Sequence, residues 1–416
     1  MTSPWHGRHL LSAPHRLAFF LAVVVLVGTS AWWALVQCDR VWGGVGLTYA
    51  VSPTLLHSVA MTFGFFPLLF AGFLFTAGPK WLGMHPLPAQ RLLPPLCLQA
   101  VGWLGWLAGG HTEVEVALAG AGLALAGLLW VQVLFWGLIR RSVVPDQLHA
   151  RIIGMAGVLG VAALVAMIAS VTLDAQGLAR QWVLTALWGF VVSTFVAVAH
   201  RMIPFFTASA VPMARTWRPN WLMGVMLMAV GMEILLIWLE WFGAGAGADV
   251  RVWMLSRGLL ELAVGSVIVW LAFVWGMVQS LKIRLLAMLH IGFVWLGLSF
   301  LLAGLSQLLG FHAGTPVLGL GALHALTMGF LGSTMVAMVT RVSSGHSGRP
   351  LAADNLVWIS FWVLQITVVL RMGAALPDAP GWALALVALI WLAAVLAWGG
   401  RMLGWYGRVR ADGQPG

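Results

Sequence analysis

The sequence predicts an all-α membrane protein, a polytopic bundle of about twelve transmembrane helices with both termini in the cytoplasm. Of its 416 residues, 61% are hydrophobic and only 8% are charged, whereas soluble proteins carry about 25% charged residues. Apolar runs of about 20 residues, the length needed to cross a bilayer, recur from end to end. These observations exclude a water-soluble fold, so residues 1–416 are expected to form a single transmembrane domain in contact with the lipid bilayer.

Twelve spans are expected from the apolar runs and the turn signals that separate them. The first run is retained as a helix, because it is as long as a full span and no small-residue cleavage site follows it. The expected spans are 17–36, 55–78, 92–109, 116–138, 152–171, 182–200, 219–241, 258–279, 285–304, 316–340, 356–372 and 382–402.

The lysines and arginines test both the number of spans and their direction. If the helices alternate, only five of the 22 basic residues fall on one side, namely Arg40, Arg180, Arg251, Arg257 and Arg371. Because cytoplasmic loops are enriched in Lys and Arg, the other side, which holds both termini, is predicted to be cytoplasmic. The formal net charge of +10 therefore reflects topology, and no nucleic acid partner is expected because no basic stripe is present.

Histidines at membrane depth are the first candidates for function, since ionisable groups inside a bilayer usually mark functional sites. His57 begins the second span, His200 ends the sixth, His290 lies in the ninth and His324 in the tenth. They could bind haem iron or copper, as two imidazoles from facing helices make an axial pair, or simply hydrogen-bond neighbouring carbonyls. For His57 and His324 the metal is preferred, because each starts a similar stretch, H-S-V-A-M and H-A-L-T-M, followed by glycines.

Other polar residues are weaker candidates. Glu233, near the middle of the seventh span, could relay protons or pair with a buried polar group, and Glu261 is expected to pair with Arg257. The longer polar connections, 201–219 and 341–355, are further places to look for function, and His346 lies in the polar run of the second. The remaining histidines lie in loops or tails and are expected to be solvated: His6, His9, His15, His85, His111, His149 and His312.

Four separated motifs make a family recognisable. They are L-H-A-L-T-M-G-F-L-G at Leu323–Gly332, continuing through Met338–Leu351; R-M-I-P-F-F-T at Arg201–Thr207; A-G-F-L-F-T-A-G-P-K-W-L-G at Ala71–Gly83; and L-H-I-G-F-V-W-L at Leu289–Leu296. In these motifs, and in their order along nearly the whole chain, the sequence resembles the NnrS family.

The resemblance implies a haem- and copper-containing, twelve-span protein of the bacterial inner membrane, linked to nitric oxide metabolism in denitrification and to resistance to nitrosative stress. Val59 and Ala60 stand where relatives commonly have a histidine and a glutamate, so this protein is expected to hold fewer metals or to use His200. The family's histidines and arginines carry over onto His57, His290, His324 and His346, and onto Arg201, Arg341 and Arg349.

Three functional hypotheses follow. In the first, the partner is nitric oxide or a related small nitrogen oxide; an enzyme of this kind would be a membrane oxidoreductase, with an electron donor from the respiratory chain and Glu233 as proton relay. The alternatives are a twelve-span small-molecule transporter and a noncatalytic assembly factor for respiratory enzymes. A carrier should show a repeat between its two halves; none is visible, and Pro67 and Pro204 do not occupy corresponding positions.

Overall fold

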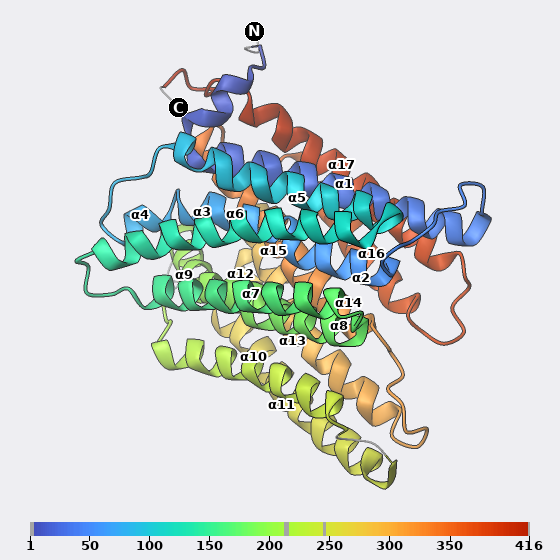
Figure 1. The fold of residues 1–416 in the computed structure, drawn as a ribbon. Helices are drawn as coiled ribbons and strands as arrows, with labels where there is room; N and C mark the ends of the chain where they lie inside the picture. The colour runs from blue at the N-terminus through green and yellow to red at the C-terminus, as the bar shows by residue number, and fades with distance from the viewer. Residues whose placement is uncertain (1–3, 212–215, 244–246, 415–416) are drawn as a thin grey trace. The chain divides into compact units, whose positions relative to one another are not determined.

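The structure is a computed structural model that describes residues 4–211, 216–243 and 247–414, and every regular element in these ranges is a helix (Figure 1). Eleven of the described helices are long and apolar enough to cross a membrane. The expected third span coincides with a further helix, α5 (Leu93–Thr112), of 20 residues, whose two prolines and Gln99 lower its hydropathy. The all-α polytopic fold is confirmed, and the cytoplasmic location of both termini stays a prediction.

The chain divides into two compact units. Residues 1–194, 342–350 and 395–416 form the first, and residues 195–341 and 351–394 form the second. Three helices, α9 (Ser193–Ala210), α15 (Ser333–His346) and α17 (Ala383–Tyr406), contribute residues to both units. That residues 1–416 form one transmembrane domain stays a prediction.

The first unit contains most of the N-terminal helices. Its elements are η1 (Gly7–Ser12), α1 (Pro14–Trp42), α2 (Pro53–Val59), η2 (Ala60–Gly64), α3 (Phe66–Leu74), α4 (Gly78–Trp81), η3 (Ala89–Arg91), α5, α6 (Val114–Arg141), α7 (Leu148–Thr172), α8 (Gln176–Ala186) and η4 (Leu187–Val192). The second unit contains α10 (Asn220–Trp241), η5 (Gly247–Asp249), α11 (Val250–Val274), α12 (Met277–Ser280), α13 (Arg284–Leu309), α14 (Gly321–His324), η6 (Ala325–Gly332) and α16 (Asn355–Gly373).

Local sequence explains where many of these helices begin. Helices α1 to α5 each carry a proline in the first turn, where the missing N–H has no intrahelical partner in any case. The α16 helix begins at an N-cap: the Asp354 carboxylate accepts a hydrogen bond of 3.0 Å from the backbone N–H of Val357, which satisfies one of the free donors at the helix start.

Glycines let neighbouring helices approach closely, as is common in membranes. The α5 and α6 helices run side by side (Figure 1), and a Cβ added to Gly102 would lie 2.5 Å from the Gly120 carbonyl oxygen. The α11 and α13 helices show the same feature, because a Cβ on Gly265 would lie 2.8 Å from the Gly297 carbonyl oxygen. In both pairs, two backbones touch where a side chain would hold them apart.

Three spans contain a π-helical turn, and they are the second, sixth and tenth, which also carry His57, His200 and His324. Their apolar windows are 83%, 78% and 78% buried, the highest values among the eleven candidate spans of the described chain. Side-chain hydroxyls satisfy carbonyls in the wide turn η4, where Ser193 Oγ donates to the Trp188 carbonyl at 3.2 Å. Since π-turns often occur at functional sites, these three spans are the strongest candidates for carrying the functional site.

The structure shortens both polar connections. The α9 helix continues to Ala210 with Pro204 inside it, and α15 continues to His346. Arg201 and Arg341 therefore lie within helices, and the connections that follow these spans begin later than the expected residues 201 and 341. Residues 212–215 of the first connection lie outside the described residues.

Candidate functional site

His324 lies at the point where α14 passes into the π-helical turn η6. Its Nδ1–H donates to the Leu320 carbonyl oxygen at 2.8 Å, which leaves the lone pair on Nε2. A histidine that binds a metal usually donates its other ring N–H in this way. The geometry of His324 is therefore that of an oriented ligand nitrogen.

Arg371, in the last turn of α16, lies close enough to His324 for its positive charge to affect the imidazole electrostatically. It reaches the site because α14 packs on the end of α16, where a Cβ on Gly321 would lie 3.6 Å from Met372 Cα. The Nη1 atom of Arg371 is buried and has no hydrogen-bond partner. A buried guanidinium nitrogen without an acceptor is costly, so this position suits a bound anionic group.

His57, in the first unit, lies in the last turn of α2, three residues before η2 begins. Its ring stacks on Trp33 with centroids 4.0 Å apart and planes at 18°, and the Arg40 guanidinium lies 5.6 Å from the centroid of the same indole. One face of the imidazole is therefore covered and its orientation is fixed. Val59 and Ala60, the two departures from the family pattern, are both fully buried.

His290 is fully buried in α13, and its tautomer follows from its neighbours. The Thr207 hydroxyl donates to the Ile203 carbonyl at 2.9 Å, and the same oxygen lies 2.9 Å from His290 Nε2. Since the hydroxyl proton is already committed, His290 Nε2–H must be the donor in this contact. Its lone pair is then on Nδ1, which is buried without a hydrogen-bond partner and is the atom through which His290 could bind a metal.

His200 is positioned by the start of α10. Its Nε2–H lies 3.2 Å from the Pro219 carbonyl oxygen, and its ring meets Trp275 edge-on at 6.3 Å between centroids. Trp275 in turn donates from its indole N–H to the Trp217 carbonyl at 3.1 Å. These contacts hold Trp217 and Pro219, which precede α10, against α9 and the end of α11.

His346 is not isolated, because its ring lies 4.7 Å from that of His15. His15 is only 2% exposed, and its Nδ1 has no hydrogen-bond partner. The expectation that His15 is solvated is therefore wrong, and so is that for His149, which is also buried. His111 is also engaged: its Nε2 accepts from Trp32 Nε1–H at 2.6 Å, and its Nδ1–H donates to the Thr48 carbonyl at 2.8 Å.

The three arginines of the motifs have different surroundings. The guanidinium of Arg341 stacks on Phe206 at 3.9 Å from the ring centroid, and that of Arg349 stacks on Trp405 at 4.6 Å. Arg349 lies beyond the end of α15, where partial burial and the neighbouring Arg408 and Arg401 lower the pKa of its guanidinium. Arg201 is half-buried in α9.

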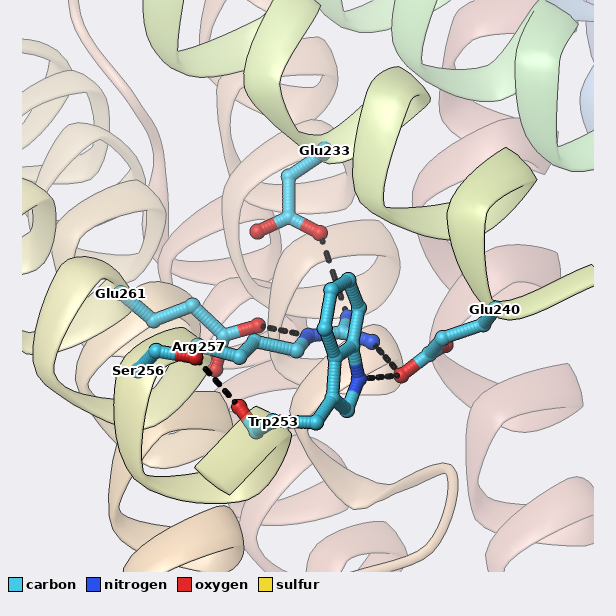
Figure 2. Close-up of polar contacts among 6 residues, drawn as sticks. All are labelled: Glu233, Glu240, Trp253, Ser256, Arg257 and Glu261. Carbon is cyan, nitrogen blue, oxygen red and sulfur yellow. Dashed lines mark hydrogen bonds and ion pairs between the residues drawn. The ribbon is translucent and has the colours of Figure 1, made fainter. Parts of the chain in front are cut away.

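A cluster of charges joins α10 to α11 (Figure 2). Arg257 donates from Nε to Glu261 at 2.7 Å, pairs through another nitrogen with Glu240, and lies 3.5 Å from Glu233. The pairing of Glu261 with Arg257 is confirmed, and Glu233 has the same buried partner. Glu233 and Glu261 are 4% and 0% exposed, and each has a buried carboxyl oxygen without a hydrogen-bond partner.

No group of three or more His, Cys, Asp or Glu side chains that could hold a metal ion occurs among the residues that the structure describes. A haem does not need such a group, since one or two axial ligands hold its iron. A copper ion held by two imidazoles would not require one either. The candidate sites are therefore single oriented histidines and the His15–His346 pair.

The comparison with protein families agrees with these features. The family described as NnrS protein matches residues 9–410. The chain belongs to the NnrS family. The match to NnrS includes the motif residues His57, His290, His324 and His346 and the motif arginines Arg201, Arg341 and Arg349. The multi-pass membrane fold agrees with the apolar composition of the helices. No curated protein matches the sequence.

Sequence reasoning missed two residues beside the NnrS motifs. Arg371 was counted only as a topological charge, although a lone arginine inside a span is a signal for a buried partner. His15 was assigned to the N-terminal tail, although it directly follows Pro14, which marks the start of a helix. The neighbours of both residues come from segments that are distant in the sequence and pack together only in the folded chain.

Proposed function

We propose that this chain is a haem-binding protein of the bacterial inner membrane that acts in nitric oxide metabolism and in resistance to nitrosative stress. Membership of the NnrS family and the positions of the family histidines support this. The observation that carries the proposal is the bond from His324 Nδ1–H to the Leu320 carbonyl, because it presents the Nε2 lone pair as an axial ligand would.

The residues around His324 fit a haem. A haem has two carboxylate side chains, and the unpartnered Nη1 of Arg371 supplies a donor and a positive charge for one of them. When bound, the haem iron supplies affinity for nitric oxide, a small uncharged molecule that can reach a buried centre through lipid. The protein would hold the iron through His324 and would anchor one carboxylate through Arg371.

The remaining histidines would play separate roles. His57, with one face of its ring covered by Trp33, is a candidate ligand within the first unit. His290 would bind only through Nδ1.

Copper is best supported at His346. With His15 it offers two neutral imidazole donors, and the charged groups that act on His346 are the cations Lys80, Arg410 and Arg16. The support for copper is the imidazole pair itself, because the positive surrounding repels any cation; since it repels Cu²⁺ more strongly than Cu⁺, the monovalent ion is favoured. A reaction that reduces nitric oxide would additionally need electrons from a respiratory-chain donor.

An absorption spectrum of detergent-purified protein from haem-replete cells tests the haem proposal. We expect a Soret band that is lost in His324→Gly and restored by added imidazole, which can occupy the vacated position. His312→Gly is the matched control, since His312 is an exposed histidine of the same unit. Colourless wild-type protein, or a His324→Gly spectrum identical to that of the wild type, would refute the proposal.

A further inference from the structure

The charge cluster of α10 and α11 holds more negative than positive charge. Three carboxyl groups, on Glu233, Glu240 and Glu261, face one guanidinium, that of Arg257. Glu240 is the most exposed of the three, with 39% of its side chain accessible, and also accepts a hydrogen bond of 2.9 Å from Trp253 Nε1–H. Water and Trp253 can therefore stabilise its charge, and the imbalance rests on the two buried carboxyl groups.

The contacts of individual oxygens show that the buried pair is incompletely satisfied. Glu261 Oε1 accepts a hydrogen bond of 2.7 Å from Arg257 Nε, whereas Glu233 Oε2 lies 3.5 Å from Arg257 Nη2, which is a long and weak contact. The second oxygens, Glu233 Oε1 and Glu261 Oε2, are buried without partners. A carboxylate in this situation is strongly disfavoured unless it takes up a proton.

Among the residues that the structure describes, no charge outside the cluster relieves the imbalance of the pair. The α13 helix packs closely on α11 through Gly258 and Gly304, and its stretch from Ile291 to Leu309 contains no ionisable residue. The charged groups that act on Glu233 are Glu261, Arg257 and Glu240, all members of the cluster. The compensating charge must therefore come from solution.

A metal ion does not suit this role. The guanidinium of Arg257 lies among the three carboxyl groups (Figure 2), at the place where a cation would have to bind, and would repel it. Among the described residues no metal-binding group of acidic side chains is found. A proton is different, because it binds to one oxygen and needs no shell of ligands.

We propose that Glu233 and Glu261 form a proton-binding site, in which the pair holds one exchangeable proton at neutral pH. The proton converts one carboxylate to a carboxylic acid and leaves the other ionised against Arg257. The two groups titrate as a unit rather than separately. Glu240, the exposed member of the cluster, links the pair to the aqueous side. This site does not depend on the haem proposal.

Reaction with dicyclohexylcarbodiimide tests the proposal on the full-length protein in lipid nanodiscs, because this apolar reagent modifies protonated carboxyl groups in apolar surroundings. Mass spectrometry of the peptides should place the adduct on Glu233 or Glu261 and not on Glu240. In Glu233→Gln or Glu261→Gln, the remaining buried carboxylate no longer shares Arg257 with a second buried carboxylate, so its labelling should fall on the order of tenfold. Glu240→Gln is the matched control and should keep the labelling, because Glu233 and Glu261 still share one guanidinium and one of them still takes up a proton.

Three results would overturn the proposal. They are wild-type protein without label at both buried positions, undiminished labelling of the remaining glutamate in the single variants, and protection by sodium ions at constant pH, which would indicate a metal cation. Infrared spectroscopy of the wild-type protein covers the case in which a variant fails to fold. A protonated carboxyl band that shifts in heavy water should be present, and its absence would also refute the proposal.

Discussion

Replacing Gly329 by alanine should destabilise the helix that carries His324. Gly329 lies in η6, and a Cβ there would lie 2.7 Å from Trp295 Cγ. Trp295 cannot easily yield, because its indole N–H donates to Gln365 at 2.7 Å and Gln365 donates to Ser333 at 2.8 Å. The added methyl group therefore presses on a hydrogen-bonded chain that borders the site.

The magnitude follows from the geometry. An ordinary van der Waals contact begins near 3.4 Å, so the indole must move by about 0.7 Å. Overpacking of this kind costs about 1–3 kcal/mol, whereas the loss of glycine's backbone freedom returns about 0.5–1 kcal/mol. The difference between these two ranges is about 0–2.5 kcal/mol, so Gly329→Ala should lower the free energy of unfolding by up to about 2.5 kcal/mol.

Gly332→Ala is the matched control within the same motif. A Cβ at Gly332 would meet nothing closer than 3.6 Å, so only the backbone gain applies and the variant should be neutral or slightly more stable. Reversible unfolding in dodecyl sulfate, followed by tryptophan fluorescence, measures both variants. If Gly329→Ala unfolds no more readily than Gly332→Ala, the packing argument is wrong.

Three further predictions concern other parts of the chain. Gly120→Ala should lower the melting temperature and Gly122→Ala should not, because a Cβ at Gly120 meets helix α5 backbone at 2.6 Å whereas one at Gly122 meets nothing within 4 Å. Thr207→Val should lower the free energy of unfolding by about 1–3 kcal/mol, because it leaves the buried N–H of His290 without an acceptor. Thr207→Ser keeps the hydroxyl group and should therefore retain most of the wild-type stability. Gly348→Ala should also destabilise, by about 1–3 kcal/mol, because Gly348 has a φ of +69°; thermal unfolding compared with the wild type checks this.

The sequence predicted the membrane fold because hydropathy and arginine placement act locally. A run of apolar residues must be helical in lipid whatever its neighbours are, so the spans could be placed without knowing their contacts. The ends of the spans depend on more than hydropathy. Helix α9 continues past His200 because Pro204 is tolerated inside a membrane helix, where its cost can be compensated by surrounding groups.

The tautomers of the histidines could not be predicted from the sequence. His324 could be chosen from its depth and its motif, but its tautomer depends on the Leu320 carbonyl, which only the local helix geometry presents. The tautomer of His290 depends on Thr207, which is 83 residues away in the chain. Such long-range contacts leave no periodic signal in the sequence.

By itself, the sequence determined that the chain is a polytopic helical membrane protein and which histidines and arginines belong to the NnrS motifs, since composition and local motifs suffice for both. The tertiary structure alone decided that His15 meets His346, that Arg371 acts on His324, and that three glutamates surround Arg257. The physical reason is that ligand orientation and surplus buried charge arise from contacts between helices, and apolar helices give no sequence pattern that specifies their neighbours.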